Sequence, residues 1–350
     1  MPATAASQPL LSLDPLLGTK KDLATIRDNL SAIVLVSDHV WLGGDEGTHL
    51  HRMTRDSRGD FGEHKRFDLA SLLDLPDQGG KPSEIDIEGL DVDKGYVWLV
   101  GSHSRKRKKV DEGKTPAQNR ERLATVEADG NRYTLARVPL DQREEPTRNA
   151  GSLSAARLAG DATGNLLTSA LTADPHVGPF CVIPSKDNGL DVEGLAVRGD
   201  RVFVGLRGPV LRGWAVLLDL QVGDATRGFL KLAQPLRKHF LNLNGLGIRD
   251  LSIHQNHLYI LAGPTMNLDG PVFIYKWPSA LDTANEAVVP REELRLILEI
   301  PYAAGADHAE GITLVDPDST NPKVMVCYDS PAPGRIVSDN AVRADVFALG

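Results

Sequence analysis

The stretch DVEGLAV, residues 191–197, places a charged glutamate and a glycine at the start of an apolar run. Two similar copies occur, DIEGLDV at residues 86–92 and HAEGITL at residues 308–314. A related copy, GIRDLSI, spans residues 247–253, and a degenerate one, LSAIVLV, spans residues 30–36. An element that recurs along a chain is typical of a repeat architecture, so these copies decide the fold.

Each copy continues in the same way. The apolar run is followed by a polar turn, such as Asp93-Lys94-Gly95, and then by a second run rich in Val, Trp, Phe, Tyr and Leu. Short β-branched and aromatic runs separated by turn residues predict β-strands. Two strands alone cannot bury their apolar faces, so we expect the units to pack against one another.

The spacing of the copies indicates how many units the chain holds. The first apolar residue of the degenerate copy is Ile33. Successive intervals between this residue and its equivalents in the later copies are 57, 105, 56 and 61 residues, so one interval covers about two periods. Further strand candidates between the copies give about four strands a unit. Four-stranded units with this period are typical of a β-propeller. We therefore expect an all-β fold, a β-propeller of five or six blades of about four antiparallel strands.

We expect a single propeller domain over residues 30–350. Residues 1–29 form an N-terminal extension, for which pairing with the last blade would supply a ring-closing strand. Insertions are expected at about residues 103–122 and 144–175. The second is predicted to be partly helical, because Leu153, Ala156 and Leu167 follow helical spacing in an Ala- and Leu-rich stretch.

The composition narrows the class of protein. Of the 350 residues, 41% are apolar and 25% are charged, which predicts a packed globular core, and 33 Gly and 22 Pro indicate many turns. The formal net charge of -8 argues against general nucleic-acid binding. The only two cysteines, Cys181 and Cys327, lie too far apart in sequence to indicate a disulfide framework or a CxxC metal site.

The chain shows no basic leader at its start and no stretch of eighteen apolar residues, so we expect a cytoplasmic protein without a membrane partner. The strongest charge run is RKRKK, residues 105–109. It predicts either a solvated loop or a docking site for an acidic partner or nucleic acid. The residues concerned are Arg105, Lys106, Arg107, Lys108 and Lys109.

The motifs DVEGLAV with GLRGPVLRGWA, then GIRDLSI and DHAEGITL, resemble in this order a bacterial family of unknown function with a predicted β-propeller fold. The resemblance covers nearly the whole chain and implies a fold rather than an activity. The EGL elements are also locally similar to phytase-like and regucalcin- or gluconolactonase-like propellers. In those proteins, acidic residues at the start of inner strands hold a divalent metal at the top of the central channel.

The repeated acidic residues are the candidate site. In a propeller the first strand of each blade lines the channel, so Glu88, Glu193, Asp250 and Glu310 are expected to converge at one mouth from four blades. Crowded carboxylates repel unless a cation lies among them, and their hard oxygens suit Ca²⁺ or Mg²⁺. Alternatively, each acid is a structural clasp that binds backbone amides of a neighbouring blade. The sequence leaves both readings open.

Three basic residues accompany the acids. Arg207 and Arg249 are expected either to bind an anionic group of a substrate or to neutralise the carboxylates. His308 is the candidate for proton transfer. Neither a GxxxxGK[ST] loop nor a GxGxxG motif occurs, so no nucleotide cofactor is expected.

Two functions follow from this pattern. The first is a metal-dependent hydrolase of a phosphoester or lactone, in which the metal polarises the substrate or activates water. The second is a non-catalytic propeller that binds a protein partner or a small ligand. Propellers serve both purposes, so the fold does not decide between them.

Overall fold

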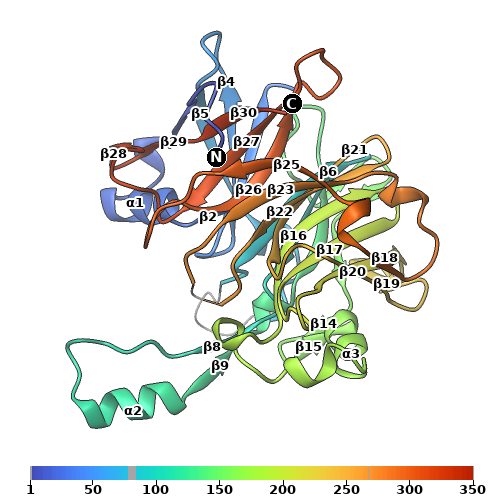
Figure 1. Ribbon diagram of the computed structural model, residues 1–350. Helices are drawn as coiled ribbons and strands as arrows, with labels where there is room; N and C mark the ends of the chain where they lie inside the picture. The colour runs from blue at the N-terminus through green and yellow to red at the C-terminus, as the bar shows by residue number, and fades with distance from the viewer. Residues whose placement is uncertain (1, 78–83, 267, 350) are drawn as a thin grey trace.

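Five strands carry the copies of the repeated motif in the computed structural model (Figure 1), which describes residues 2–77, 84–266 and 268–349. These inner strands are β2 (Leu30–Val36), β6 (Ile87–Asp93), β16 (Asp191–Arg198), β21 (Gly247–His254) and β26 (His308–Val315). Each lies against two others, in the order β2, β6, β16, β21, β26 and back to β2. A closed ring of inner strands is the arrangement of a β-propeller, so the predicted fold class is confirmed, with five inner strands among the described residues.

From each inner strand the chain runs back and forth to form an antiparallel sheet, and each sheet is one blade. The first blade continues through β3 (His39–Gly44), β4 (His49–Arg55) and β5 (Phe61–Asp68), and the second through β7 (Tyr96–Gly101), β10 (Leu135–Pro139) and β13 (Ala156–Leu158). The third continues through β17 (Arg201–Gly208), β18 (Ala215–Asp224) and β20 (Arg237–Leu241), and the fourth through β22 (His257–Gly263), β23 (Val272–Trp277) and β25 (Arg295–Ile300). The fifth contains β27 (Lys323–Asp329) and β30 (Asp345–Ala348).

The polar turns recognised in the sequence join the first two strands of the blades. In the second blade, Lys94 (φ 48°) and Gly95 (φ 75°) both have left-handed backbone conformations, and Asp93 pairs with Tyr96 across the turn. Two-residue turns of this kind match the right-handed twist of the strands that they connect.

The N-terminal residues lie against the last blade and the first. Ser7 forms an antiparallel bridge with Val346 of β30, and the Val346 amide donates to the Ser7 carbonyl at 2.9 Å. β1 (Leu10–Ser12) then pairs with β29 (Ala341–Arg343) and, at Leu11, with β5. The segment also carries η1 (Pro15–Leu17) and α1 (Lys20–Asp28), whose Leu23 is buried in the core shared by these two blades.

An arm that projects from the second blade occupies the first expected insertion (Figure 1). It consists of β8 (Arg105–Arg107), the helix α2 (Pro116–Ala124) and β9 (Val126–Ala128). The middle of the basic run is engaged in ion pairs within the chain, namely Lys106 with Glu84, Arg107 with Asp187 and Lys108 with Glu127. These pairs are half-exposed and individually weak, so they position the base of the arm rather than stabilise the fold.

The second expected insertion contains short strands and one helix. Leu153 and Ala156 lie in the strands β12 (Leu153–Ser154) and β13, and only Leu167 lies in a helix, α3 (Leu166–Thr172). The glycines at 160 and 164 interrupt the Ala- and Leu-rich stretch, because they form the short hairpin that precedes α3. That hairpin pairs β14 (Gly160–Asp161) with β15 (Gly164–Asn165).

The remaining elements extend the blades or connect them. The extra strands are β11 (Asn149–Ala150), β19 (Phe229–Leu232), β24 (Ala287–Val289) and β28 (Ile336–Ser338). The short 3-10 helices are η2 (Leu69–Ser71), η3 (Gly130–Tyr133), η4 (Gly178–Phe180), η5 (Ser185–Asp187), η6 (Ala280–Asp282) and η7 (Arg291–Glu293). Of the helices in the described ranges, none combines the length and the apolar character that a membrane span requires.

The inner strands approach one another so closely that a side chain does not fit between some of them. A Cβ atom built on Gly89 would lie 2.6 Å from the Leu195 nitrogen of the next inner strand. One built on Gly194 would lie 2.7 Å from the Asp250 Cα atom, again in the next strand. The glycine of the EG pair is therefore a packing requirement of the ring, since any side chain there would push neighbouring blades apart.

Gly194→Ala is expected to reduce the free energy of unfolding by about 2 kcal/mol more than Gly213→Ala. Both glycines have left-handed φ angles, 87° and 93°, but an added Cβ at Gly213 meets nothing within 4 Å. Gly213→Ala therefore reports the backbone strain alone, and the difference between the variants reports the close approach of the strands. Urea unfolding measures both, and equal losses would contradict this account of the ring.

Candidate site at the channel mouth

Every inner strand carries an irregularity in its pairing where the glutamates occur. The register with the second strand shifts between Ile87 and Gly89 in β6 and between Ala309 and Gly311 in β26, with corresponding shifts in the other three inner strands. A bulge of this kind redirects a side chain away from the ordinary alternation of a strand. The pairing skips one buried side chain in each inner strand, namely Ser31, Glu88, Glu193, Arg249 and Glu310, and in β16 it also skips Gly194.

Arg249, rather than Asp250, occupies the position of the glutamates in β21. Its Nη1 donates to Glu193 Oε2 at 3.1 Å and to Glu310 Oε1 at 2.8 Å. These partners come from the two inner strands that flank β21, so one guanidinium joins three blades. Breaking such a buried pair from one side is costly, because a charge is then left without a partner.

Arg207, in β17, provides a second guanidinium on the same carboxylates. Its Nη1 lies 2.6 Å from Glu193 Oε1, and its Nη2 donates to Asp191. Glu193 is thus held by both arginines that the sequence singled out. Its charge is compensated within the protein, and both arginines are engaged before any substrate arrives.

Asp250 is used differently. Its Oδ1 accepts the Leu251 amide at 2.8 Å and its Oδ2 accepts the Ile312 amide of the next blade at 2.7 Å. Burial raises the pKa of Asp250, and the two amide hydrogen bonds oppose this by stabilising the carboxylate. This geometry is that of a clasp between blades. Asp91 makes the same kind of contact, accepting the Val197 amide of the neighbouring inner strand at 2.6 Å.

Glu88 belongs to a separate group of carboxylates with Asp45 and Asp86. One oxygen atom from each of the three lies within 4.8 Å of the others. Asp86 pairs with Arg132 at 2.6 Å, whereas Glu88 is 8% exposed and makes no hydrogen bond or ion pair with any described residue. The Asp45 Oδ1 atom is also buried without a partner among these residues. We call Asp45, Asp86 and Glu88 the carboxylate triad.

The triad is electrostatically unfavourable as it stands. Burial raises the pKa of Glu88 well above its ordinary value, and Asp45 and Asp86 add to the increase by repulsion. The pKa of Asp45 is raised in the same way, by burial first and then by Asp86. A folded protein tolerates a group of buried acids without compensating positive charge when protons or a cation neutralise them.

The wider channel mouth also carries excess negative charge. Six carboxylates there are accompanied by three buried arginines, with Lys186 as an exposed positive charge nearby. Burial raises the pKa of Glu310 to about 7, against the attraction of Arg249. The residues counted are Asp45, Asp86, Glu88, Asp191, Glu193 and Glu310 on one side and Arg132, Arg207 and Arg249 on the other.

His308 lies half-buried at the start of β26. Its Nε2 is 3.2 Å from Asp269 Oδ1 and its Nδ1 is 3.8 Å from Asp329 Oδ2. The neighbouring carboxylate of Asp329 is the main reason that the pKa of His308 is raised, with Asp269 adding to it. An imidazole held between two carboxylates is more readily a proton donor than a proton acceptor near neutral pH.

The structure thus divides the four predicted metal ligands among three settings. Glu193 and Glu310 share Arg249, Asp250 binds amides, and Glu88 faces two acids that the sequence analysis did not select. The signal for Asp86 was present, because it lies two residues before Glu88 in the motif itself. Asp45 lies just after the second strand of the degenerate copy, where no repeated pattern marks it.

The model of one protein family matches residues 29–345. Its description is "Protein of unknown function (DUF3616)". The chain belongs to this family. The match covers the whole ring of inner strands and agrees with the resemblance noted in the sequence. The search of the curated proteins found no match.

Solved structures similar to this DUF3616 protein include β-propellers of several kinds. The glutaminyl cyclase of Myxococcus xanthus is 10% identical, with a TM-score of 0.45 over 99% of this chain and 97% of that one. The β-propeller domain of Cps50 (Swd1) from Myceliophteria thermophila is 9% identical, with a TM-score of 0.37 over the whole of both chains. A streptogramin B lyase is 10% identical, with a TM-score of 0.35 over 98% of this chain and 97% of that one. Identities this low carry no activity over to the present chain.

Glu88→Gln is expected to raise the thermal midpoint at pH 8 in metal-free buffer and to raise it much less at pH 5. Because folding raises the pKa of Glu88, the folded state binds a proton that the unfolded chain releases above its ordinary pKa near 4.5. The stability that Glu88 contributes is therefore full below that value and is lost as the pH rises. Glutamine carries no charge and removes this loss. Thermal unfolding followed by circular dichroism measures the effect.

Asp250→Asn is the variant to compare with Glu88→Gln, because Asp250 has hydrogen-bond partners and Glu88 has none among the described residues. An asparagine has one carbonyl oxygen, so one of the amides of Leu251 and Ile312 loses its acceptor. We expect a loss of about 1–3 kcal/mol in the free energy of unfolding at pH 5. The loss should be smaller at pH 8, because burial also raises the pKa of Asp250 and its contribution to stability therefore falls as the pH rises. A stabilised Asp250→Asn, or a destabilised Glu88→Gln at pH 8, would contradict the division between clasp and triad.

Proposed function

We propose that the protein binds a divalent cation through Asp45, Asp86 and Glu88 and uses it to hydrolyse a small phosphoester or lactone at the channel mouth. The observation that carries the proposal is the carboxylate triad, in which Glu88 is buried without a partner while its oxygen lies within 4.8 Å of two other acids. A cation would neutralise the excess charge and occupy the oxygen atoms that no described group satisfies.

The chemistry of the donors favours Ca²⁺ or Mg²⁺. All three ligands are carboxylates, and hard oxygen donors suit these cations rather than softer metals. Arg132 holds Asp86 from the side, with its Nη1 at 2.6 Å from Asp86 Oδ2. Partners of this kind fix the orientation of a ligand before the metal binds.

Residues around the triad would supply the rest of the reaction. A divalent cation polarises a phosphoryl or carbonyl oxygen and lowers the pKa of a water molecule. Arg249 and Arg207 give the mouth positive charge that could stabilise an anionic transition state, although each is already paired with Glu193. His308, with its raised pKa, would protonate the leaving group.

We place this activity in the reducing cytoplasm. Cys181 and Cys327 are both free thiols, and Cys327 is buried. Proteins of oxidising compartments more often join such residues in disulfides.

A second candidate is a non-catalytic propeller that binds a small ligand or a protein partner. Specific contacts favour it, because Asp250 serves as a clasp and Arg249 Nη1 is already paired with Glu193 and Glu310. In this case, the triad would hold a cation or protons for structural reasons alone. The two candidates differ in whether metal binding is accompanied by turnover.

Millimolar Mg²⁺ or Ca²⁺ is expected to raise the thermal midpoint of the EDTA-treated protein. A ligand at 100 times its dissociation constant stabilises the folded state by about 2.7 kcal/mol. Asp45→Asn and Glu88→Gln should each abolish the shift. Glu46→Gln is the matched control, because Glu46 is exposed and adjacent to Asp45, and it should keep the shift. A shift that survives both triad variants would place the metal elsewhere.

Hydrolysis is expected with p-nitrophenyl phosphate, bis-p-nitrophenyl phosphate or a simple lactone as substrate, and only with metal present. Glu88→Gln should lower kcat/KM at least about 100-fold, and His308→Gln should lower kcat with little change in metal affinity. Glu46→Gln should retain full activity. If metal binds at the triad and none of these substrates turns over, the result supports the non-catalytic candidate.

A further inference from the structure

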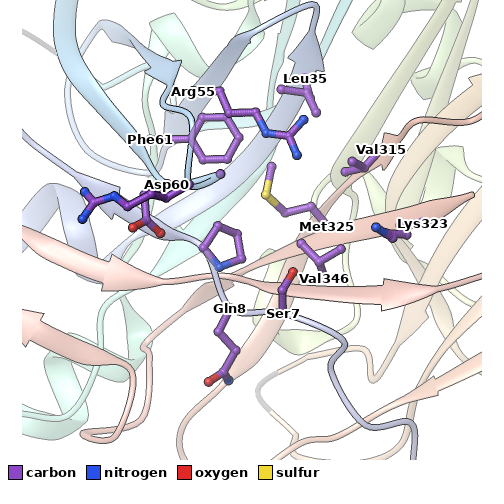
Figure 2. A pocket seen from close by; sticks show the side chains of 13 residues that line it. Ser7, Gln8, Leu35, Arg55, Asp60, Phe61, Val315, Lys323, Met325 and Val346 are labelled. Carbon is purple, nitrogen blue, oxygen red and sulfur yellow. The ribbon is translucent and has the colours of Figure 1, made fainter.

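A hollow lies where the ring closes, and none of the residues that line it belongs to the carboxylate triad. It is bordered by the N-terminal segment Ser7–Pro9, the first blade and the fifth blade, and has a volume of about 180 Å³. Figure 2 shows Arg55 and Phe61 on one side, Val315 and Lys323 on the other, and Met325 between them. We call this hollow the closure pocket.

The floor of the closure pocket is apolar and preformed. Phe61, Val315, Met325 and Val346 line it, and all four are buried members of the core that the first and last blades share. Their side chains are fixed by this packing, so the hollow does not have to be opened for a ligand to enter. Apolar cavities of about 150 Å³ admit a molecule the size of benzene.

Two unpaired cations stand over this floor, one from each blade. Arg55, at the end of β4, and Lys323, at the start of β27, both line the pocket and are half-buried. Neither side chain forms an ion pair or hydrogen bond with any residue in the described ranges. A cation without a partner beside an apolar surface loses hydration and gains nothing in return.

The other charged residues of the pocket already have partners. Arg58 pairs with Asp56 at 3.1 Å, and Asp60 accepts the Leu10 amide at 2.8 Å. Asp60 keeps its negative charge, because an amide is a neutral partner, but the two cations without a partner outnumber this one carboxylate, in a chain whose net charge is -8. This is the arrangement that binds an anion with an apolar body.

We propose that the closure pocket binds a small organic carboxylate of about the size of benzoate. The carboxylate would lie between Arg55 and Lys323, and the apolar body would lie on Met325 and Phe61. Because its walls come from the first blade, the last blade and the N-terminal segment, the occupied pocket would also hold the ring closed. The site is independent of the triad and of the proposed metal.

Benzoate and its neutral analogue benzyl alcohol test the proposal on the full chain. We expect saturable binding of benzoate by isothermal titration calorimetry, with a concentration-dependent rise in the thermal midpoint. Benzyl alcohol should bind at least about tenfold more weakly, because it lacks the charge that Arg55 and Lys323 recognise. A crystal soaked in benzoate should show its carboxylate between these two side chains.

Arg55→Met and Lys323→Met keep an aliphatic side chain and remove the charge, and each should weaken benzoate binding about tenfold. Lys231→Met removes an exposed charge outside the pocket and should leave the affinity unchanged. Circular dichroism checks that the variants remain folded. Three results would overturn the proposal. They are equal binding of benzoate and benzyl alcohol, an unchanged benzoate affinity when Arg55→Met and Lys323→Met are combined, and no benzoate binding at all.

Discussion

The close approach of five inner strands around one axis is the constraint on which the rest of the structure depends. It excludes side chains at Gly89 and Gly194 and accompanies a break in pairing in every inner strand. The break directs one residue from each blade to the channel mouth. Because four of these five residues are charged, the packing of the ring and the electrostatics of the site are consequences of one arrangement.

The protein meets the cost of collecting charges at the axis in two ways. On one side, Arg249 and Arg207 satisfy Glu193, and Arg249 also binds Glu310, so charge is cancelled within the chain. On the other side, Glu88 lies beside two more acids, and within the described ranges the one ion pair that an arginine makes with this triad is that of Arg132 with Asp86. Ion pairs within the chain account for the buried charges on the first side, but they do not account for the buried carboxylates on the second side. The second side is where we propose that an external cation binds.

The repeated EG pairs predicted the propeller and the convergence of acids, because repeat spacing and strand periodicity are local properties of the sequence. They could not show that Arg249 takes the place of a glutamate, since a one-residue shift decides this and bulges are not readable from the letters. Asp45 was missed because its approach to Glu88 depends on how two blades pack. Copies of the same motif also supply both a clasp residue, Asp250, and a member of the carboxylate triad, Glu88.

The most direct test is a crystal structure of the protein grown or soaked with Mn²⁺, which has an anomalous signal and replaces Mg²⁺ or Ca²⁺ at oxygen sites. The account predicts an anomalous difference peak bounded by carboxylate oxygens of Asp45, Asp86 and Glu88, with Arg249 still bridging Glu193 and Glu310. A channel mouth without a peak at saturating Mn²⁺, or a peak between Glu193 and Glu310 with Arg249 displaced, would contradict it.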